Sequence, residues 1–180
     1  MLDGMKTYKI KNLASVQTGT FGSQLHQRDY IKNGIPILTV EHLGENKILH
    51  NDLPCISEQD RERLKKYTLL EGDIFFSRVG SVDRRAFVSK EEAGWLFSGR
   101  CLRIRPNTEI VNGKFLSYYF GLETFKMYIR GIVVGATMPS LNTSILIEIV
   151  LQIQHLDEQV WIASILSSLD DKIELDLQMN

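Results

Sequence analysis

The chain has 180 residues, of which 43% are hydrophobic and 24% are charged, a composition typical of a folded globular protein that excludes wholesale disorder. The 21 basic residues are balanced by 22 acidic ones, for a net charge of −1. This balance excludes a uniformly basic nucleic-acid binder.

The cysteines and the apolar runs predict a cytoplasmic protein. Cys55 and Cys101 are far apart in the sequence, so neither a disulfide scaffold nor a zinc site is expected. The most apolar stretch, residues 145–153, is interrupted by Glu148 and Gln152 and has about half the length of a membrane span. No membrane partner is therefore expected.

Charge is distributed unevenly along the chain. Basic residues outnumber acidic ones by five between positions 61 and 105, whereas acidic residues outnumber basic ones by five between positions 151 and 180. This asymmetry suggests a polyanion-binding surface in the middle and a protein-binding surface at the end, although solvated faces of ordinary elements would explain the same counts.

The first third of the chain predicts short strands joined by polar turns. Residues 8–18 are typical of a strand pair, or of a strand and a turn, and lead into a glycine-containing loop at residues 18–24. A β-branched strand is expected at residues 35–40. Ser57 begins a sequence that resembles a capping box, which predicts a short helix through Lys66.

A β-hairpin is expected next, with a buried strand at residues 74–77, a polar turn rich in arginine at residues 78–84, and a return strand at residues 85–88. Apolar and basic residues then alternate from Cys101 to Arg105. This alternation predicts a strand with one face in the core and with Arg103 and Arg105 on the exposed face.

The C-terminal part predicts helices around one more strand. Residues 112–130 have helical spacing of aromatic and aliphatic residues, with a weak point at Gly121. Residues 131–141 are expected to be irregular. Apolar residues alternate again from 147 to 153, which indicates a final strand.

The last segment predicts an amphipathic helix with Asp157 as its N-cap. Ile162, Leu166, Leu169 and Ile173 fall at coiled-coil spacing along one face. Trp161, Ala163 and Ile165 widen this apolar stripe. A helix this apolar on one side is not stable alone in water, and we expect it to pair with a second copy or with a partner's helix in preference to docking on its own domain.

No catalytic constellation or metal site is predicted. The four histidines lack metal-ligand spacing, and no serine lies in a nucleophile elbow. A metal-dependent nuclease built on Asp29, Glu45 and Lys47 is a weak alternative, because residues 44–47 are typical of a hairpin turn. The sequence therefore favours a binding protein.

Three motifs together resemble a known family. The hairpin at residues 72–84, the loop at residues 135–142, and the segment 158–174, with Glu-Gln followed by I-A-x-I-L-x-x-L-D-x-K-I-E, resemble in order and spacing the DNA-specificity subunit of type I restriction-modification systems. The resemblance covers about residues 8–177. It implies an α/β (α+β) fold, with a mixed-sheet target recognition domain at residues 1–154 and a long coiled-coil-type spacer helix at residues 155–180.

The resemblance also implies partners. Subunits of this family usually carry two recognition domains and two antiparallel helices, so a chain with one of each would pair with a second copy, and each copy would read half of a split site in double-stranded DNA. A modification subunit that binds S-adenosylmethionine and methylates adenine, and a restriction subunit that cuts, would perform the chemistry. No cofactor is expected in this chain.

The predicted DNA contacts are arginines and small polar residues, which clamp phosphates or read base edges. They are Thr18, Thr20, Ser23, Gln24, Arg28, Arg78, Ser81, Arg84, Arg85, Arg103, Arg105, Thr137, Ser140 and Asn142. The alternative is a truncated protein-interaction module that docks on the modification subunit without reading DNA.

Overall fold

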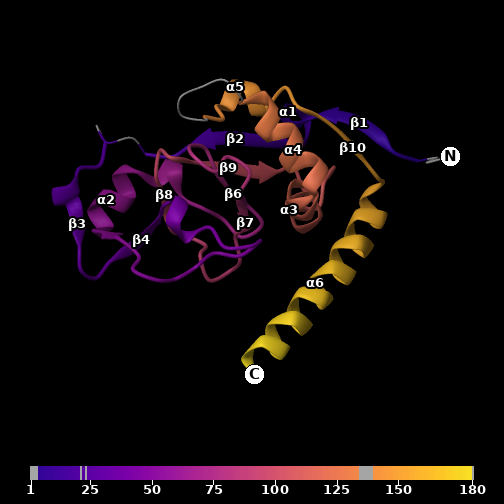
Figure 1. Ribbon diagram of the computed structural model, residues 1–180. Helices are drawn as coiled ribbons and strands as arrows, with labels where there is room; N and C mark the ends of the chain where they lie inside the picture. Colours follow the sequence, from indigo (N-terminus) through magenta and orange to yellow (C-terminus); the bar gives the residue numbers. More distant parts are fainter. Residues whose placement is uncertain (1–3, 21, 23, 134–139, 180) are drawn as a thin grey trace.

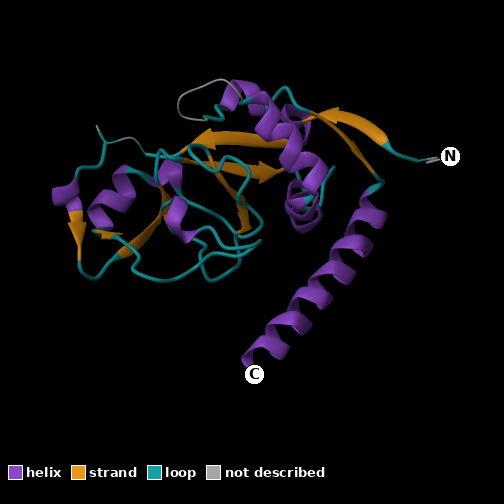
Figure 2. Cartoon of the chain, in the orientation of Figure 1, coloured by secondary structure: helices purple, strands orange, loops and turns teal. Residues whose placement is uncertain are grey.

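The computed structural model describes residues 4–20, 22, 24–133 and 140–179. The fold is mixed α/β, as predicted, with the strands gathered in a globular part and one long helix extending beside it (Figures 1 and 2). The central sheet has the order β2-β9-β6-β7 with every neighbouring pair antiparallel. Its strands are β2 (Ala14–Thr18), β6 (Ile74–Ser77), β7 (Arg85–Phe87) and β9 (Cys101–Pro106).

A second sheet, of order β3-β5-β4-β8, packs against one face of the central sheet. Its strands are β3 (Tyr30–Ile31), β4 (Ile35–Leu38), β5 (Cys55–Ile56) and β8 (Leu96–Phe97). The short helices η1 (Gln27–Asp29), η2 (Val40–His42), α2 (Glu58–Arg63) and η3 (Lys65–Tyr67) surround it. The Ser57 cap is confirmed, because its hydroxyl accepts a 3.1 Å hydrogen bond from the Asp60 amide.

The central sheet is buried on both faces. In β6, Ile74 and Phe76 point into one hydrophobic cluster with helices α3 and α4, whereas Phe75 points into the other cluster with the second sheet. Because successive side chains of a strand point to opposite faces, this arrangement accounts for the unbroken apolar run in β6. The predicted hairpin is confirmed as β6 and β7, which pair antiparallel with Phe75 opposite Ala86.

The predicted helix at residues 112–130 is confirmed as two helices, α3 (Gly113–Gly121) and α4 (Glu123–Ile132), with the break next to Gly121. Asn112 caps α3 by accepting a 3.0 Å hydrogen bond from the Phe115 amide. The side chain of Arg85 passes against Gly121 so closely that a Cβ there would lie 2.0 Å from its Nη2. The glycine at this position is therefore required by tertiary packing.

The N-terminal segment and the segment before the last helix close the domain together. β1 (Lys6–Lys9) pairs antiparallel with β10 (Val150–Ile153), and α1 (Ile10–Leu13) supplies the turn expected within residues 8–18. Lys9 and Lys11 form ion pairs with Glu148 at 2.7 and 2.6 Å. The final strand is shorter than predicted, since residues 147–149 precede it and a helical turn, α5 (Thr143–Leu146), comes before them.

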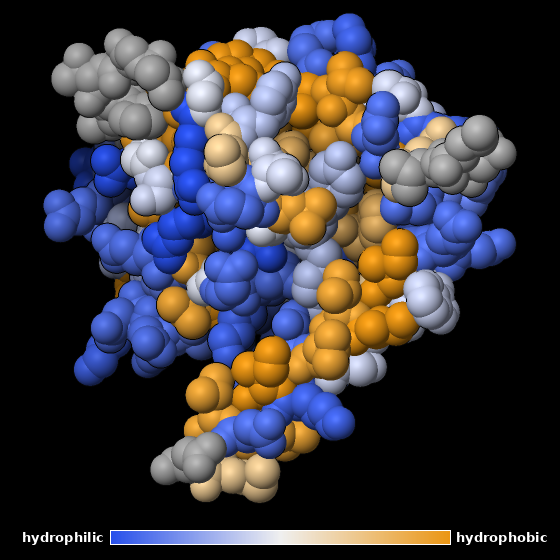
Figure 3. All heavy atoms as spheres, turned by 45° about the vertical axis from the view of Figure 1, so that its right-hand side comes forward, coloured by the Kyte–Doolittle hydropathy of each residue, from blue (hydrophilic) through white to orange (hydrophobic). Residues whose placement is uncertain are grey.

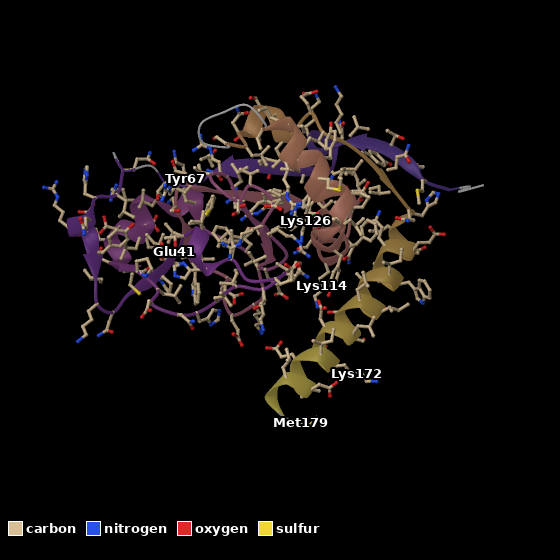
Figure 4. All side chains as sticks on the ribbon, viewed as in Figure 1. Glu41, Tyr67, Lys114, Lys126, Lys172 and Met179 are labelled. Carbon is tan, nitrogen blue, oxygen red and sulfur yellow. The ribbon has the colours of Figure 1, made fainter. Side chains whose placement is uncertain are left out.

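The long helix α6 (Leu156–Gln178) begins after His155, so the prediction of Asp157 as N-cap is wrong and Asp157 lies in the first turn. The expectation that the helix does not dock on its own domain is also wrong for its first half, because Gln159 and Ala163 are buried in the domain and α6 packs on α3. In the second half the contacts are polar: Lys114 of α3 donates to Ser167 at 3.0 Å, and Figure 4 shows Lys114 between α3 and α6.

An apolar face of α6 stays exposed. Trp161 is 66% exposed, Leu169 51% and Ile173 58%. Figure 3 shows hydrophobic surface along the long helix. The described helices include none with the length and apolar character of a transmembrane span.

Candidate nucleic-acid interface

Segments that are far apart in the sequence meet at one end of the central sheet. The Gly99 amide donates to the Thr20 carbonyl at 2.6 Å, and the Arg78 amide donates to the Arg100 carbonyl at 3.0 Å. Residues 79 and 140 form an isolated β-bridge. We call this region the loop edge and define it by Thr18, Thr20, Arg78, Ser98, Arg100 and Ser140.

The loop edge is closely packed because Gly19 allows it. A Cβ on Gly19 would lie 2.2 Å from the carbonyl oxygen of Ser98, so any side chain there would push the two loops apart. The glycine-rich loop thus has a structural role, which is to bring the end of β2 against the turn between β8 and β9. The predicted contacts Thr20 and Arg78 consequently both bind Gly99, Thr20 through its carbonyl and Arg78 through its guanidinium.

A cleft of about 310 Å³ opens at the loop edge. It is lined by Thr20, Gly22, Leu25, Tyr30, Arg78, Ser98, Gly99 and Arg100. Burial, together with the nearby charge of Asp29, raises the pKa of Tyr30, so its phenol stays protonated and can donate a hydrogen bond. The cleft therefore offers two guanidinium groups, hydroxyls and a phenol, which are donors suited to phosphate oxygens and base edges.

Three predicted DNA contacts are buried. Thr20 is 5% exposed but still lines the cleft, whereas for Arg85 and Arg103 the prediction that they present their charge at the surface is wrong. Arg85 is 5% exposed and donates from Nε to the Ser117 carbonyl at 3.0 Å. Arg103 is 8% exposed and donates from Nη1 to the Thr68 carbonyl at 3.0 Å, and burial lowers the pKa of its guanidinium. The alternation in β9 suggested a solvated face, but the second sheet covers it.

Arg105 is held by a structural ion pair. Its Nε and Nη2 donate to the two carboxylate oxygens of Asp73, each at 2.7 Å, and Asp73 is 1% exposed. Nη2 also donates to the Thr68 carbonyl at 3.1 Å, so three of the five N–H donors are used within the protein. Arg105 therefore stabilises the packing between β9 and the turn before β6.

The predicted contacts at the hairpin tip are partly exposed and partly engaged in hydrogen bonds within the fold. Ser81 and Arg84 are exposed, and the Arg84 guanidinium donates to the carbonyls of Val40 and Leu43. This contact ties the tip to the segment around η2. Arg78 is half-buried and donates from Nη1 to the Gly99 carbonyl at 3.0 Å, which fixes the turn between β8 and β9.

The remaining predicted contacts lie around the loop edge. Gln24 accepts a 2.7 Å hydrogen bond from the Tyr67 hydroxyl, which anchors its loop on η3, while the Arg28 side chain is 83% exposed. Ser140 and Asn142 are exposed, and Asn142 caps α5 by accepting from the Ile145 amide at 2.9 Å. The candidates Ser23 and Thr137 lie outside the described residues.

Two residues of the cleft, Tyr30 and Arg100, are absent from the contacts predicted from the sequence. Arg100 belongs to the basic stretch at residues 61–105. Its position directly after Gly99 was the feature of the sequence that could have indicated an exposed arginine in a turn. Tyr30 gave no signal, because the side chains that face it come from distant segments.

The residues predicted to form a partner-binding helix face are placed on α6 in two groups. Trp161, Ile165, Leu169 and Ile173 are exposed. Ile162 and Leu166 instead line a cavity of about 600 Å³ together with Phe115, Tyr119 and Leu122. The apolar face predicted as a single stripe is thus shared between the domain and solvent.

One side-chain group within the described ranges has the composition of a metal site. Ligand atoms of His50, Glu91 and Glu92 lie within 4.8 Å of one another. The Glu92 carboxylate is already engaged, at 2.6 Å by His50 Nε2 and at 2.7 Å by the Ser89 hydroxyl. These contacts account for the group as a cap on the turn at Ser89.

Comparison with known proteins gives a consistent result. A family model described as the type I restriction modification DNA specificity domain matches residues 3–180. The type I restriction enzyme MjaVIII specificity subunit of Methanocaldococcus jannaschii is 23% identical over 171 residues, or 93% of this chain and 40% of that protein. The HindI specificity subunit of Haemophilus influenzae is 28% identical over 82% of this chain and 33% of that protein.

Solved structures share the fold. A chain from a structure of the type I R-M system superposes with a TM-score of 0.72 at 15% identity, covering 97% of this chain and 40% of that one. The HsdS subunit from Thermoanaerobacter tengcongensis superposes with a TM-score of 0.68 at 14% identity, covering 97% and 39%. The chain thus spans about 40% or less of the length of these relatives.

Proposed function

Since the chain belongs to the family of type I restriction modification DNA specificity domains, we propose that it binds double-stranded DNA at one sequence and directs a type I restriction-modification complex to that sequence. The observation that carries this proposal is the cleft at the loop edge, where Arg78, Arg100 and Tyr30 meet from separate segments. The methyl transfer, with its S-adenosylmethionine, and the DNA cleavage would belong to a modification and a restriction subunit.

The proposed DNA contacts are the loop edge together with Arg28 and Asn142. Phosphate contacts from these residues would position the duplex, and contacts to base edges would select the sequence. Arg84 remains a proposed contact through the exposed part of its side chain, whereas Arg85, Arg103 and Arg105 take no part because their guanidinium groups are engaged within the fold.

Methylation sequencing tests this function. A host lacking its own restriction-modification genes would express the chain with a type I modification subunit from the same genome. We expect methylation at one sequence motif only when both chains are present. A protein-interaction module would instead copurify with the modification subunit and leave every motif unmethylated, and that result would refute the DNA-reading proposal.

We also propose that two copies pair through α6 and that each reads half of a bipartite site. The exposed apolar face of Trp161, Leu169 and Ile173 supports pairing, because such a face is stabilised by covering it from water. Acidic residues are concentrated at positions 170–176, and serines at positions 164–168. Antiparallel pairing would bring the acids of one helix beside the serines of the other, whereas parallel pairing would bring acids together.

Leu169→Asp tests the pairing, since it would bury an unpaired carboxylate between the helices. We expect this variant to shift the mass measured by light scattering from dimer to monomer. Thr108→Asp adds the same charge at an exposed position in the turn after β9, outside α6, and should remain dimeric. If the Leu169→Asp protein stays dimeric, the contact between the two copies does not involve this face of α6. If the assembled wild-type complex contains a single copy of the chain, the self-pairing proposal is wrong.

A further inference from the structure

Arg100 differs from the other arginines because its guanidinium makes no ion pair or hydrogen bond with a described residue. Each of the others has at least one side-chain ion pair or hydrogen bond within the protein. Within the described ranges no such contact is made by the guanidinium of Arg100, which is exposed. All five of its N–H donors are therefore available to a ligand.

The backbone that carries Arg100 is held in place from several sides. The turn closes on itself through a 3.0 Å hydrogen bond from the Cys101 amide to the Ser98 carbonyl. The Gly99 amide is bound by the Thr20 carbonyl at 2.6 Å, and the Arg100 carbonyl is bound by the Arg78 amide at 3.0 Å. The side chain of Arg78 adds a further 3.0 Å bond to the Gly99 carbonyl.

The backbone of Arg100 is held in place, and its guanidinium is available to a ligand. This combination favours recognition of a base edge over simple attraction to the charge of a phosphate. Arginine can bind a phosphate through both arms of its guanidinium as well, so the loss of discrimination at one base pair is the measurement that separates a base contact from a phosphate contact. Bidentate recognition of a base edge needs a planar group delivered from a defined position. The neighbours of Arg100 in the turn, Gly99 and Ser98, are small, which leaves room for a base edge to approach.

Resting on the proposed function, we infer that Arg100 is a specificity-determining residue that binds the O6 and N7 acceptors of a guanine in the major groove. Guanine is the base that offers two acceptors to one guanidinium. Arg78 is a positioning residue, since its side chain holds the turn from which Arg100 extends. The half-site read by this chain therefore contains a G·C pair opposite Arg100.

The test compares Arg100→Ala, Arg100→Lys and the control Arg61→Ala, each expressed with the modification subunit. Arg61 lies on α2 and pairs with Glu58, so its loss removes the same charge away from the cleft. The probe is a duplex carrying the motif that wild-type methylation sequencing identifies, together with duplexes changed at each G·C pair in turn.

We expect Arg100→Ala to bind the identified duplex about tenfold to a hundredfold more weakly and to lose discrimination at one G·C position of the methylated motif. Arg100→Lys keeps the charge without the planar fork, so it should weaken the same discrimination, though less than Arg100→Ala does. Arg61→Ala should retain the motif and the affinity.

An unchanged motif in Arg100→Ala would overturn the inference while leaving the proposed function intact. Equal weakening on every duplex, with affinity restored by Arg100→Lys, would identify a phosphate contact and would also overturn it. A wild-type complex that methylates no motif would refute the proposed function itself. A melting temperature equal to that of the wild type would confirm that each variant keeps its fold.

Discussion

The attachment of α6 to the domain depends on the buried side chain of Gln159, and removing its hydrogen bonds gives a sharp prediction. Gln159 is fully buried. Its Nε2 donates to the Gln154 carbonyl at 2.8 Å and to the Ile110 carbonyl at 3.3 Å, and its Oε1 accepts from the Asn112 amide at 2.9 Å. One side chain thus joins the start of α6 to the end of β10 and to the segment that caps α3.

The magnitude follows from the backbone groups that would lose their partner. Each buried polar group left unpaired costs about 1–3 kcal/mol. We take about 1 kcal/mol for each of the three groups, because Ile110, Asn112 and Gln154 are half-buried and water can replace part of the interaction. Gln159→Met, which keeps the volume, should therefore lower the free energy of unfolding by about 3 kcal/mol, and the melting temperature by about 6–12 °C.

Thermal and urea unfolding followed by circular dichroism measures this change. Gln152→Met is the matched control, because Gln152 is exposed on β10 and its substitution should change the free energy of unfolding by less than about 0.5 kcal/mol. If Gln159→Met were as stable as this control, the reasoning that Gln159 anchors α6 through hydrogen bonds would be wrong. Gln159→Ala should cost more than Gln159→Met, because it adds a cavity.

Two further predictions concern the packing of the domain. Gly121→Ala should lower the free energy of unfolding by about 2 kcal/mol, because its Cβ would collide with the buried Arg85, whereas Gly131→Ala meets open space and should be neutral or stabilising in the same urea titration. The two lysines that bind Glu148 lower the pKa of this carboxyl from 4.5 to about 2. Stability from these pairs is fully present above pH 4.5 and is lost as the pH falls toward 2. The melting temperatures of wild type and Glu148→Gln should therefore differ at pH 6 and converge near pH 2, and a constant difference would contradict this account.

The elements set by local chemistry were predictable from the sequence. The apolar run of β6 with the turn that follows it, the Ser57 cap and the amphipathic pattern of α6 each depend on neighbours within a few positions. The family resemblance also came from motifs that are contiguous in the sequence. For this reason the mixed α/β fold and the membership of the specificity family were both correctly predicted.

Which arginines are buried and which are exposed was decided by the tertiary structure alone. Arg85, Arg100 and Arg103 all belong to the basic stretch at residues 61–105. Packing brings carbonyl oxygens of Ser117 and Thr68 to Arg85 and Arg103, whereas no described residue binds the guanidinium of Arg100. A charged side chain is buried only when distant backbone supplies its hydrogen bonds, and a pattern along one strand contains no information about that backbone. The position of α6 is a similar case, because the apolar stripe specifies that something must cover it, whereas the three-dimensional contacts of Gln159 and Ala163 determine which part the domain itself covers.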